Sequence, residues 1–115
     1  MKTGYFGKLK FYPKNLRFVS IARFCKFWTG ERYLTLAPLA DMFGLNNPQE
    51  FKKQYSERVL AKLDPKKVYE ELADAVILCY EKWDDIKSGK TFCHRRLVAE
   101  WLEKELCVSV PELEI

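Results

Sequence analysis

The reactive side chains of this chain gather between Val76 and Arg96. An apolar segment, Val76 to Tyr80, is followed at once by Glu81, and the run Cys93-His94-Arg95-Arg96 begins 12 residues later. A carboxylate, thiols, an imidazole and guanidinium groups suit acid-base, nucleophilic and anion-binding chemistry. A fold rarely needs such a cluster to hold it together, so function is sought here first.

Cys93 and His94 are the candidate catalytic pair. Cys93 stands at the start of an expected helix beside His94 and Arg95, surroundings that lower the pKa of a thiol. Cys93 is therefore a candidate nucleophile or redox thiol, and a half-buried cysteine that caps the helix is the alternative. His94 is the only histidine of the chain, so imidazole acid-base chemistry has no other source. A lone histidine is also often a hydrogen-bonded structural group.

Glu81 follows the apolar segment directly and completes the catalytic candidates. It suits a base, a ligand to a ribose hydroxyl, or the ion-pair partner of Arg23 or Arg95. Ligands of open parallel sheets bind beyond the carboxyl ends of the strands, where Tyr5 and Arg23 are also expected. Free amide groups at the helix start attract anions. We therefore expect an anion pocket made by Arg23, the helix start and Arg95 or Arg96, with Tyr5 nearby.

The elements that position these residues alternate between strands and helices. Strands are expected near residues 2–6, 17–22, 76–80 and 108–110, and helices from Asn47-Pro48, from Asp64-Pro65 and from near Cys93. Asn or Asp before proline indicates a helix start, because the side chain caps free amides and proline fits the first turn. Residues 24–47 and 83–90 are expected to be irregular. The order predicts an α/β fold, a single layered domain over residues 1–115 with a small, largely parallel sheet flanked by helices.

The composition excludes several classes of protein. Hydrophobic residues make up 48% and charged residues 31% of the chain, as in ordinary globular proteins. No apolar run approaches the roughly 20 residues of a membrane span, and the start lacks the apolar region of a signal peptide. We therefore expect a cytoplasmic protein with no membrane partner and with reduced cysteines. The sequence does not indicate an oligomeric state.

Cofactor motifs are absent from the sequence. The four cysteines form no C-x-x-C pair. Only Cys93 and His94 are close, and adjacent residues seldom bind one ion, so the spacing indicates no metal site. No glycine-rich phosphate loop is present, which argues against ordinary ATP or NAD enzymes and leaves the cofactor unknown.

Charge and aromatic residues are concentrated in the first 35 residues. These hold eight Lys or Arg against the single acid Glu31, a net charge of +7, and nine of the 17 aromatic residues. Basic residues interleaved with aromatic residues suit a nucleic acid, because cations neutralise phosphates and rings stack on bases. A packed aromatic core under solvated lysines is the alternative.

Three segments carry a family resemblance: Ser20-Ile21-Ala22-Arg23, Leu78-Cys79-Tyr80-Glu81-Lys82, and the run from Cys93 to Leu102. Together they resemble the domain-of-unknown-function 488 family of small bacterial, archaeal and phage proteins, over nearly the whole chain. The resemblance implies an α/β sandwich and a polar site at Arg23, Glu81, Cys93, His94 and Arg95. It implies no activity. The segment from Lys82 to Phe92 is longer than the short, proline-containing loop common in the family, a difference that would reshape or cover the pocket.

Three functions follow from these patterns. The first is an enzyme acting on a nucleotide or nucleic-acid substrate, with arginines holding phosphate. The second is a non-catalytic nucleic-acid-binding module, and the third is a mobile-element protein that engages a host protein through Phe24, Phe27 and Trp28. We favour the enzyme, because a basic patch alone does not require the catalytic candidates Glu81, Cys93 and His94.

Overall fold

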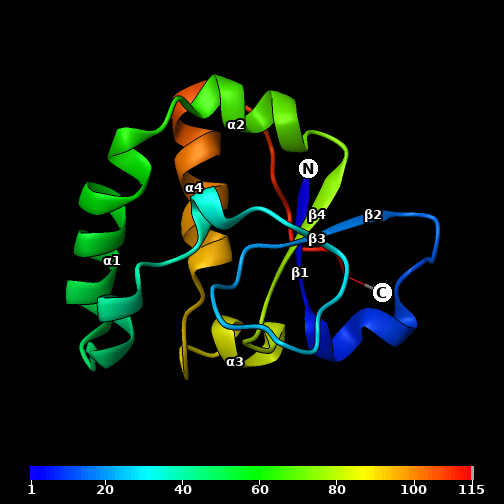
Figure 1. Ribbon diagram of the computed structural model, residues 1–115, viewed down its shortest axis with the longest axis horizontal. Coiled ribbons are helices and arrows are strands. Elements are labelled where there is room, and N and C mark those ends of the chain that lie inside the picture. Colours follow the sequence, from blue (N-terminus) through cyan, green and yellow to red (C-terminus); the bar gives the residue numbers. More distant parts are fainter. Residues whose placement is uncertain (115) are drawn as a thin grey trace.

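The computed structural model, which describes residues 1–114, is built on a four-stranded parallel sheet in the order β1-β4-β2-β3 (Figure 1). The strands are β1 (Lys2–Tyr5), β2 (Arg17–Ser20), β3 (Glu31–Arg32) and β4 (Ala75–Cys79). The predicted α/β fold with a largely parallel sheet is therefore confirmed. The strand expected at 108–110 is wrong, because the chain end meets β1 only through one bridge between Thr3 and Glu112. The two-residue strand β3 was not expected from the sequence.

Helices α1 (Pro48–Arg58) and α2 (Pro65–Leu72) begin where the capping residues predict. The other α-helices are α3 (Trp83–Lys87) and α4 (His94–Leu106). The 3₁₀ helices are η1 (Phe6–Phe11), η2 (Leu34–Leu36), η3 (Ala40–Gly44) and η4 (Leu60–Lys62). The Asn47 side chain accepts the Gln49 amide at 2.8 Å, and the Asp64 side chain accepts the Lys66 amide at 3.0 Å. The short helix α3 lies in a segment expected to be irregular. None of the helices in the described residues has the length and apolarity needed to cross a membrane.

Strand β4 is the centre of the sheet and is covered on both faces. Ile77 packs into the larger core with helices α1, α2 and α4, which lie on one side of the sheet in Figure 1. Val76 and Leu78 face the other way and pack against Tyr12 and the η1 segment. All five residues of β4 are buried, as expected for an apolar run in a parallel sheet.

A buried ion pair joins α4 to the end of the chain. Arg95 donates from Nε and Nη2 to the two carboxylate oxygens of Glu112, each at 3.0 Å, and the two side chains are 0% and 1% exposed. Thr3 donates to the same carboxylate at 2.6 Å, and Arg96 donates to Thr3 Oγ1 at 2.8 Å. The Arg95 charge is thus neutralised inside the protein, and the carboxylate links β1, α4 and the chain end.

Removing the Glu112 carboxylate tests this link. We expect Glu112→Ala to lower the free energy of unfolding by about 3 to 5 kcal/mol, because it leaves the buried Arg95 guanidinium without a counter-charge. Urea denaturation measures the change. Glu105→Ala, which removes an exposed carboxylate of the same helix α4, is the control and should change the free energy by less than about 0.5 kcal/mol. Equal effects of the two substitutions would contradict the role given to the pair.

Candidate functional site

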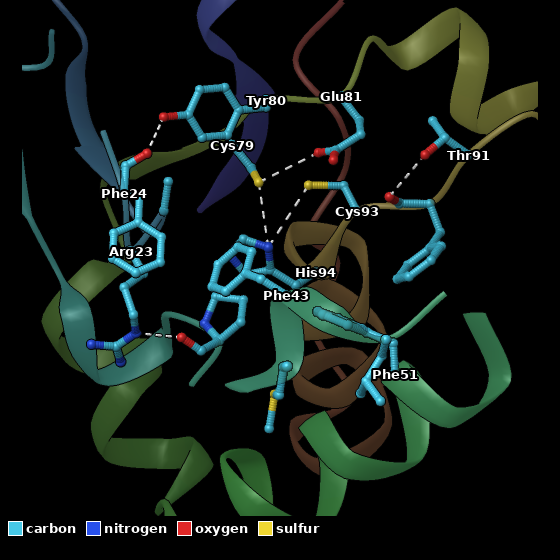
Figure 2. A pocket seen from close by; sticks show the side chains of 15 residues that line it. Arg23, Phe24, Phe43, Phe51, Cys79, Tyr80, Glu81, Thr91, Cys93 and His94 are labelled. Carbon is cyan, nitrogen blue, oxygen red and sulfur yellow. Dashed lines mark hydrogen bonds between the residues drawn. The ribbon is translucent and has the colours of Figure 1, made fainter. Parts of the chain in front are cut away.

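A pocket opens at the carboxyl ends of β2 and β4, where ligands of parallel sheets bind (Figure 2). Its cavity has a volume of about 210 Å³. It contains four of the residues singled out by the sequence, Arg23 after β2, Glu81 after β4, and Cys93 and His94 at the start of α4. The remaining lining residues are mainly apolar: Ala22, Phe24, Pro38, Met42, Phe43, Leu45, Phe51, Cys79, Tyr80, Thr91 and Phe92.

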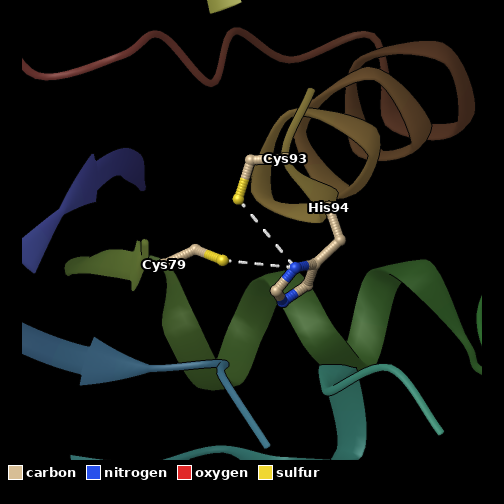
Figure 3. Close-up of side chains that lie close together, drawn as sticks. All are labelled: Cys79, Cys93 and His94. Carbon is tan, nitrogen blue, oxygen red and sulfur yellow. Dashed lines mark hydrogen bonds between the residues drawn. The ribbon is translucent and has the colours of Figure 1, made fainter. Parts of the chain in front are cut away.

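Two sulfur atoms and one imidazole nitrogen converge at one wall of this pocket (Figure 3). Cys79 is the last residue of β4, Cys93 occupies the N-cap position of α4, and His94 is the first residue of α4. The Nδ1 atom of His94 lies 3.3 Å from the Cys79 sulfur and 3.9 Å from the Cys93 sulfur. The three ligand atoms all lie within 4.8 Å of one another, and all three residues are buried. The cluster therefore depends on β4 and α4 meeting end to end.

The second nitrogen of His94 sets the orientation of the ring. Nε2 lies 2.9 Å from the carbonyl oxygen of Ile21. A carbonyl accepts hydrogen bonds only, so Nε2 carries a proton and donates it, which leaves Nδ1 to face the two sulfur atoms. The Tyr55 ring packs edge-on against the imidazole at 5.6 Å. His94 is thus held on two sides with Nδ1 directed toward the sulfur atoms of Cys79 and Cys93.

The two thiols have opposite acid-base character. Burial and the neighbouring Cys93 raise the pKa of Cys79 well above its usual value. Burial also opposes ionisation of Cys93, but hydrogen bonds with Cys79 and His94 and the positive charges of His94 and Arg95 outweigh it and hold the pKa of Cys93 well below its usual value. The Cys93 thiol is thus the more acidic member of the pair.

Glu81 places a carboxyl group beside the sulfur atoms. Its Oε2 atom lies 3.6 Å from the Cys79 sulfur. Burial, with the charge of Cys93 and a hydrogen bond to it, raises the pKa of Glu81 to about 7. Within residues 1–114 no basic side chain forms an ion pair with Glu81, so the expected pairing with Arg23 or Arg95 is wrong. A carboxyl group with these properties can both donate and accept a proton near neutral pH.

Aromatic rings form much of the remaining pocket wall. The rings of Phe24 and Phe43 lie 5.2 Å apart and their residues are 61% and 53% exposed. Phe51 and Phe92, less exposed, meet edge-to-face at 5.1 Å. Phe24 is further held by the Tyr80 hydroxyl, which donates to the Phe24 carbonyl. The pocket therefore offers flat apolar surfaces next to a polar cluster.

The predicted anion-binding residues are not gathered in one place. Arg23 lines the pocket, but its Nε donates to the Pro38 carbonyl and its side chain reaches away from the sulfur atoms in Figure 2. Arg95 is paired with Glu112, and its guanidinium lies over the Tyr5 ring at 5.5 Å. Arg96 bonds Thr3 and the Val110 carbonyl. The anion pocket expected from Arg23 and Arg95 or Arg96 is therefore not formed.

Comparison with known proteins identifies no relative. No protein-family model, no curated protein and no solved structure matches this chain. The resemblance to the domain-of-unknown-function 488 family stays a prediction.

Cys79 is the member of the cluster that the sequence favoured as inert core rather than as a site residue. A cysteine inside an apolar strand resembles inert core, and Cys79 is 14 positions from Cys93. One signal was present: side chains alternate along a strand, so Cys79 lies on the same face as Ile77, the face that the helices cover. Phe43, in the segment expected to be irregular, carried no local signal.

The basic, aromatic first third divides between core and surface. Tyr5 and Tyr12 are buried, whereas Phe11 and Phe27 are 58% and 61% exposed. Trp28 is half-buried and packs against Phe6. Part of the pattern is therefore packed core and part is exposed, and binding of a nucleic acid by the exposed rings stays a prediction.

The protonation of His94 can be measured directly, because the chain has one histidine. In long-range ¹H–¹⁵N spectra we expect Nε2 to be protonated at neutral pH, since it donates to the Ile21 carbonyl. The coupling pattern distinguishes the two ring nitrogens. An unprotonated Nε2 would show that the ring is flipped and that Nδ1 does not face the sulfur atoms.

Proposed function

We propose that the protein is a cytoplasmic enzyme that acts on the base of a nucleoside or nucleotide held in this pocket. Glu81 is the acid-base group, and the cluster of Cys79, Cys93 and His94 is the nucleophilic centre. The observation that carries the proposal is the position of these four residues at one wall of an otherwise aromatic pocket. Reactive groups that converge on a pocket with apolar walls are typical of an active site.

The aromatic walls of the pocket favour a planar substrate. Phe24 and Phe43 expose a large part of their rings at the pocket. Stacking of a base on an aromatic ring contributes about 1 to 3 kcal/mol. The pocket wall offers few cations, because the structure places Arg95 and Arg96 elsewhere and leaves Arg23 as the only arginine of the lining. We therefore assign recognition to the base, with Arg23 the one group available to a phosphate.

The polar groups of the pocket can transfer a proton to a bound base while a nucleophile adds to it. The Glu81 carboxyl lies next to the Cys79 sulfur and lines the same pocket as Cys93 and His94. A base held between the rings would present its polar edge to this wall. Glu81 would then protonate a ring nitrogen of the base while a nucleophile held at the cluster adds to the adjacent ring carbon. The new bond forms as the C=N π bond breaks, and the electron pair left on the nitrogen takes the Glu81 proton. Positioned acid-base groups of this kind contribute about 10²- to 10⁴-fold in rate.

Stacking on Phe43 is tested by binding. We expect at least one of the four ribonucleosides to shift amide resonances of residues 22–24, 79–81 and 91–94 in ¹H–¹⁵N spectra. Phe43→Ala should weaken that binding about 10-fold, because it removes one stacking surface. Phe11→Ala is the control, since Phe11 is equally exposed but lies outside the pocket.

Two outcomes would count against this substrate. Pocket resonances that respond to no ribonucleoside or 5′-monophosphate would contradict the proposal. Binding of a single-stranded oligonucleotide alone, with an affinity that falls steeply with salt, would favour the second candidate instead. That candidate is a nucleic-acid-binding surface on the exposed rings Phe11 and Phe27 and the lysines Lys8 and Lys10, which lie over the Phe11 ring.

The role of Glu81 is tested by turnover. Each nucleoside that binds is incubated with the protein, and the products are separated by liquid chromatography and mass spectrometry. We expect Glu81→Gln to lower the rate at least roughly 100-fold while the nucleoside still binds, because the amide cannot transfer a proton. Glu105→Gln on the exposed face of α4 should leave the rate unchanged. Equal rates in wild type and Glu81→Gln would remove Glu81 from the mechanism.

A further inference from the structure

The cluster of Cys79, Cys93 and His94 contains one more thiol than a thiolate nucleophile requires. A thiolate nucleophile requires one sulfur atom and one base, whereas here two thiols and an imidazole direct their ligand atoms to one point. Each of the three residues is buried, and within residues 1–114 none of them belongs to a salt bridge. We propose that these residues bind a single Zn²⁺ ion with Cys79 Sγ, Cys93 Sγ and His94 Nδ1.

The spacing of the three atoms agrees with tetrahedral zinc. With Zn–S bonds of about 2.3 Å and Zn–N bonds of about 2.0 Å, neighbouring ligand atoms lie about 3.5 to 3.8 Å apart. The distances from His94 Nδ1 to the sulfur atoms are 3.3 Å and 3.9 Å, and no pair of ligand atoms exceeds 4.8 Å. Shifts of up to about 1 Å in the sulfur positions complete the geometry.

The hydrogen bond of His94 to Ile21 is the one that metal-binding histidines make. Such a histidine donates its second ring N–H to a carbonyl or carboxylate, which fixes the tautomer and directs the other nitrogen to the ion. Nε2 of His94 lies 2.9 Å from the Ile21 carbonyl, and the free nitrogen points at the sulfur atoms. This contact comes from the residue that follows β2 and is independent of the two cysteines, so the ring is oriented before any ion binds.

The type of the ligands indicates which ion binds, and their number indicates whether the ion is catalytic or structural. Two thiolates and an imidazole suit zinc and do not suit Mg²⁺ or Ca²⁺, which require oxygen ligands. Three protein ligands leave a fourth position, as in catalytic rather than structural zinc sites. The three residues line the pocket, and Glu81 lies beside Cys79 but outside the group of three. A water in the fourth position would therefore meet both the carboxyl group and a bound substrate.

Metal titration tests the site without a substrate. Reduced, chelator-treated protein is titrated with Zn²⁺ against a chromophoric chelator, and with Co²⁺ in the visible region. We expect one equivalent of either ion, with the intense cobalt bands of a tetrahedral, thiolate-bound site. Cys79→Ser and Cys93→Ser should each weaken zinc binding at least roughly 100-fold, because each removes a ligand atom. Cys107→Ser, at an exposed cysteine outside the cluster, should bind as the wild type does.

X-ray absorption of the zinc-loaded wild type gives a readout that does not depend on the folding of a variant. We expect two sulfur ligands at about 2.3 Å and at least one nitrogen at about 2.0 Å. Substoichiometric binding, a shell of oxygen and nitrogen alone, or unchanged affinity in a folded Cys79→Ser protein would overturn the site. If the protein binds a nucleoside but no zinc, only the proposed zinc site is overturned. If it binds zinc but no nucleoside, only the proposed substrate is overturned.

Discussion

The position of β4 between β1 and β2 is the constraint on which the rest of this structure depends. A parallel strand with neighbours on both edges and cover on both faces must bury every side chain, and all five residues of β4 are buried. Its carboxyl end then emerges beside the end of β2 and the start of α4. Cys79 and Glu81 therefore reach the same pocket as His94, although the segments are far apart in the chain.

Two adjacent residues in the first turn of α4 have different roles: Arg95 stabilises the fold, and His94 belongs to the candidate site. Arg95 points to Glu112 and ties the helix to the chain end and to β1 through Thr3. The adjacent His94 points the other way, to Ile21 after β2 and to the sulfur atoms. The buried ion pair fixes the rotation of the helix, and that rotation places Nδ1 of His94. The positive charge of the buried Arg95 also lowers the pKa of Cys93.

Most of the helices and strands, and part of the candidate site, could be predicted from the sequence. Caps at Asn47 and Asp64 and the unbroken apolar run after Ala75 are local signals, and both helices and β4 are where these signals place them. The role of Arg95 was not predictable, because its partner Glu112 lies 17 positions away in an irregular segment. Cys79 was interpreted as inert core for the same reason: its neighbours in the cluster come from the start of α4, and local periodicity does not describe contacts between elements.

The proposed chemistry has one centre: three ligand atoms where the end of β4 meets the start of α4, with an aromatic pocket and a carboxyl group beside them. The enzyme function and the zinc ion are two statements about that centre. A crystal structure of the zinc-loaded protein, with anomalous scattering measured at the zinc edge, tests it most directly. We predict one anomalous peak within bonding distance of Cys79 Sγ, Cys93 Sγ and His94 Nδ1. Zinc bound elsewhere, with these three atoms left without an ion, would contradict the account.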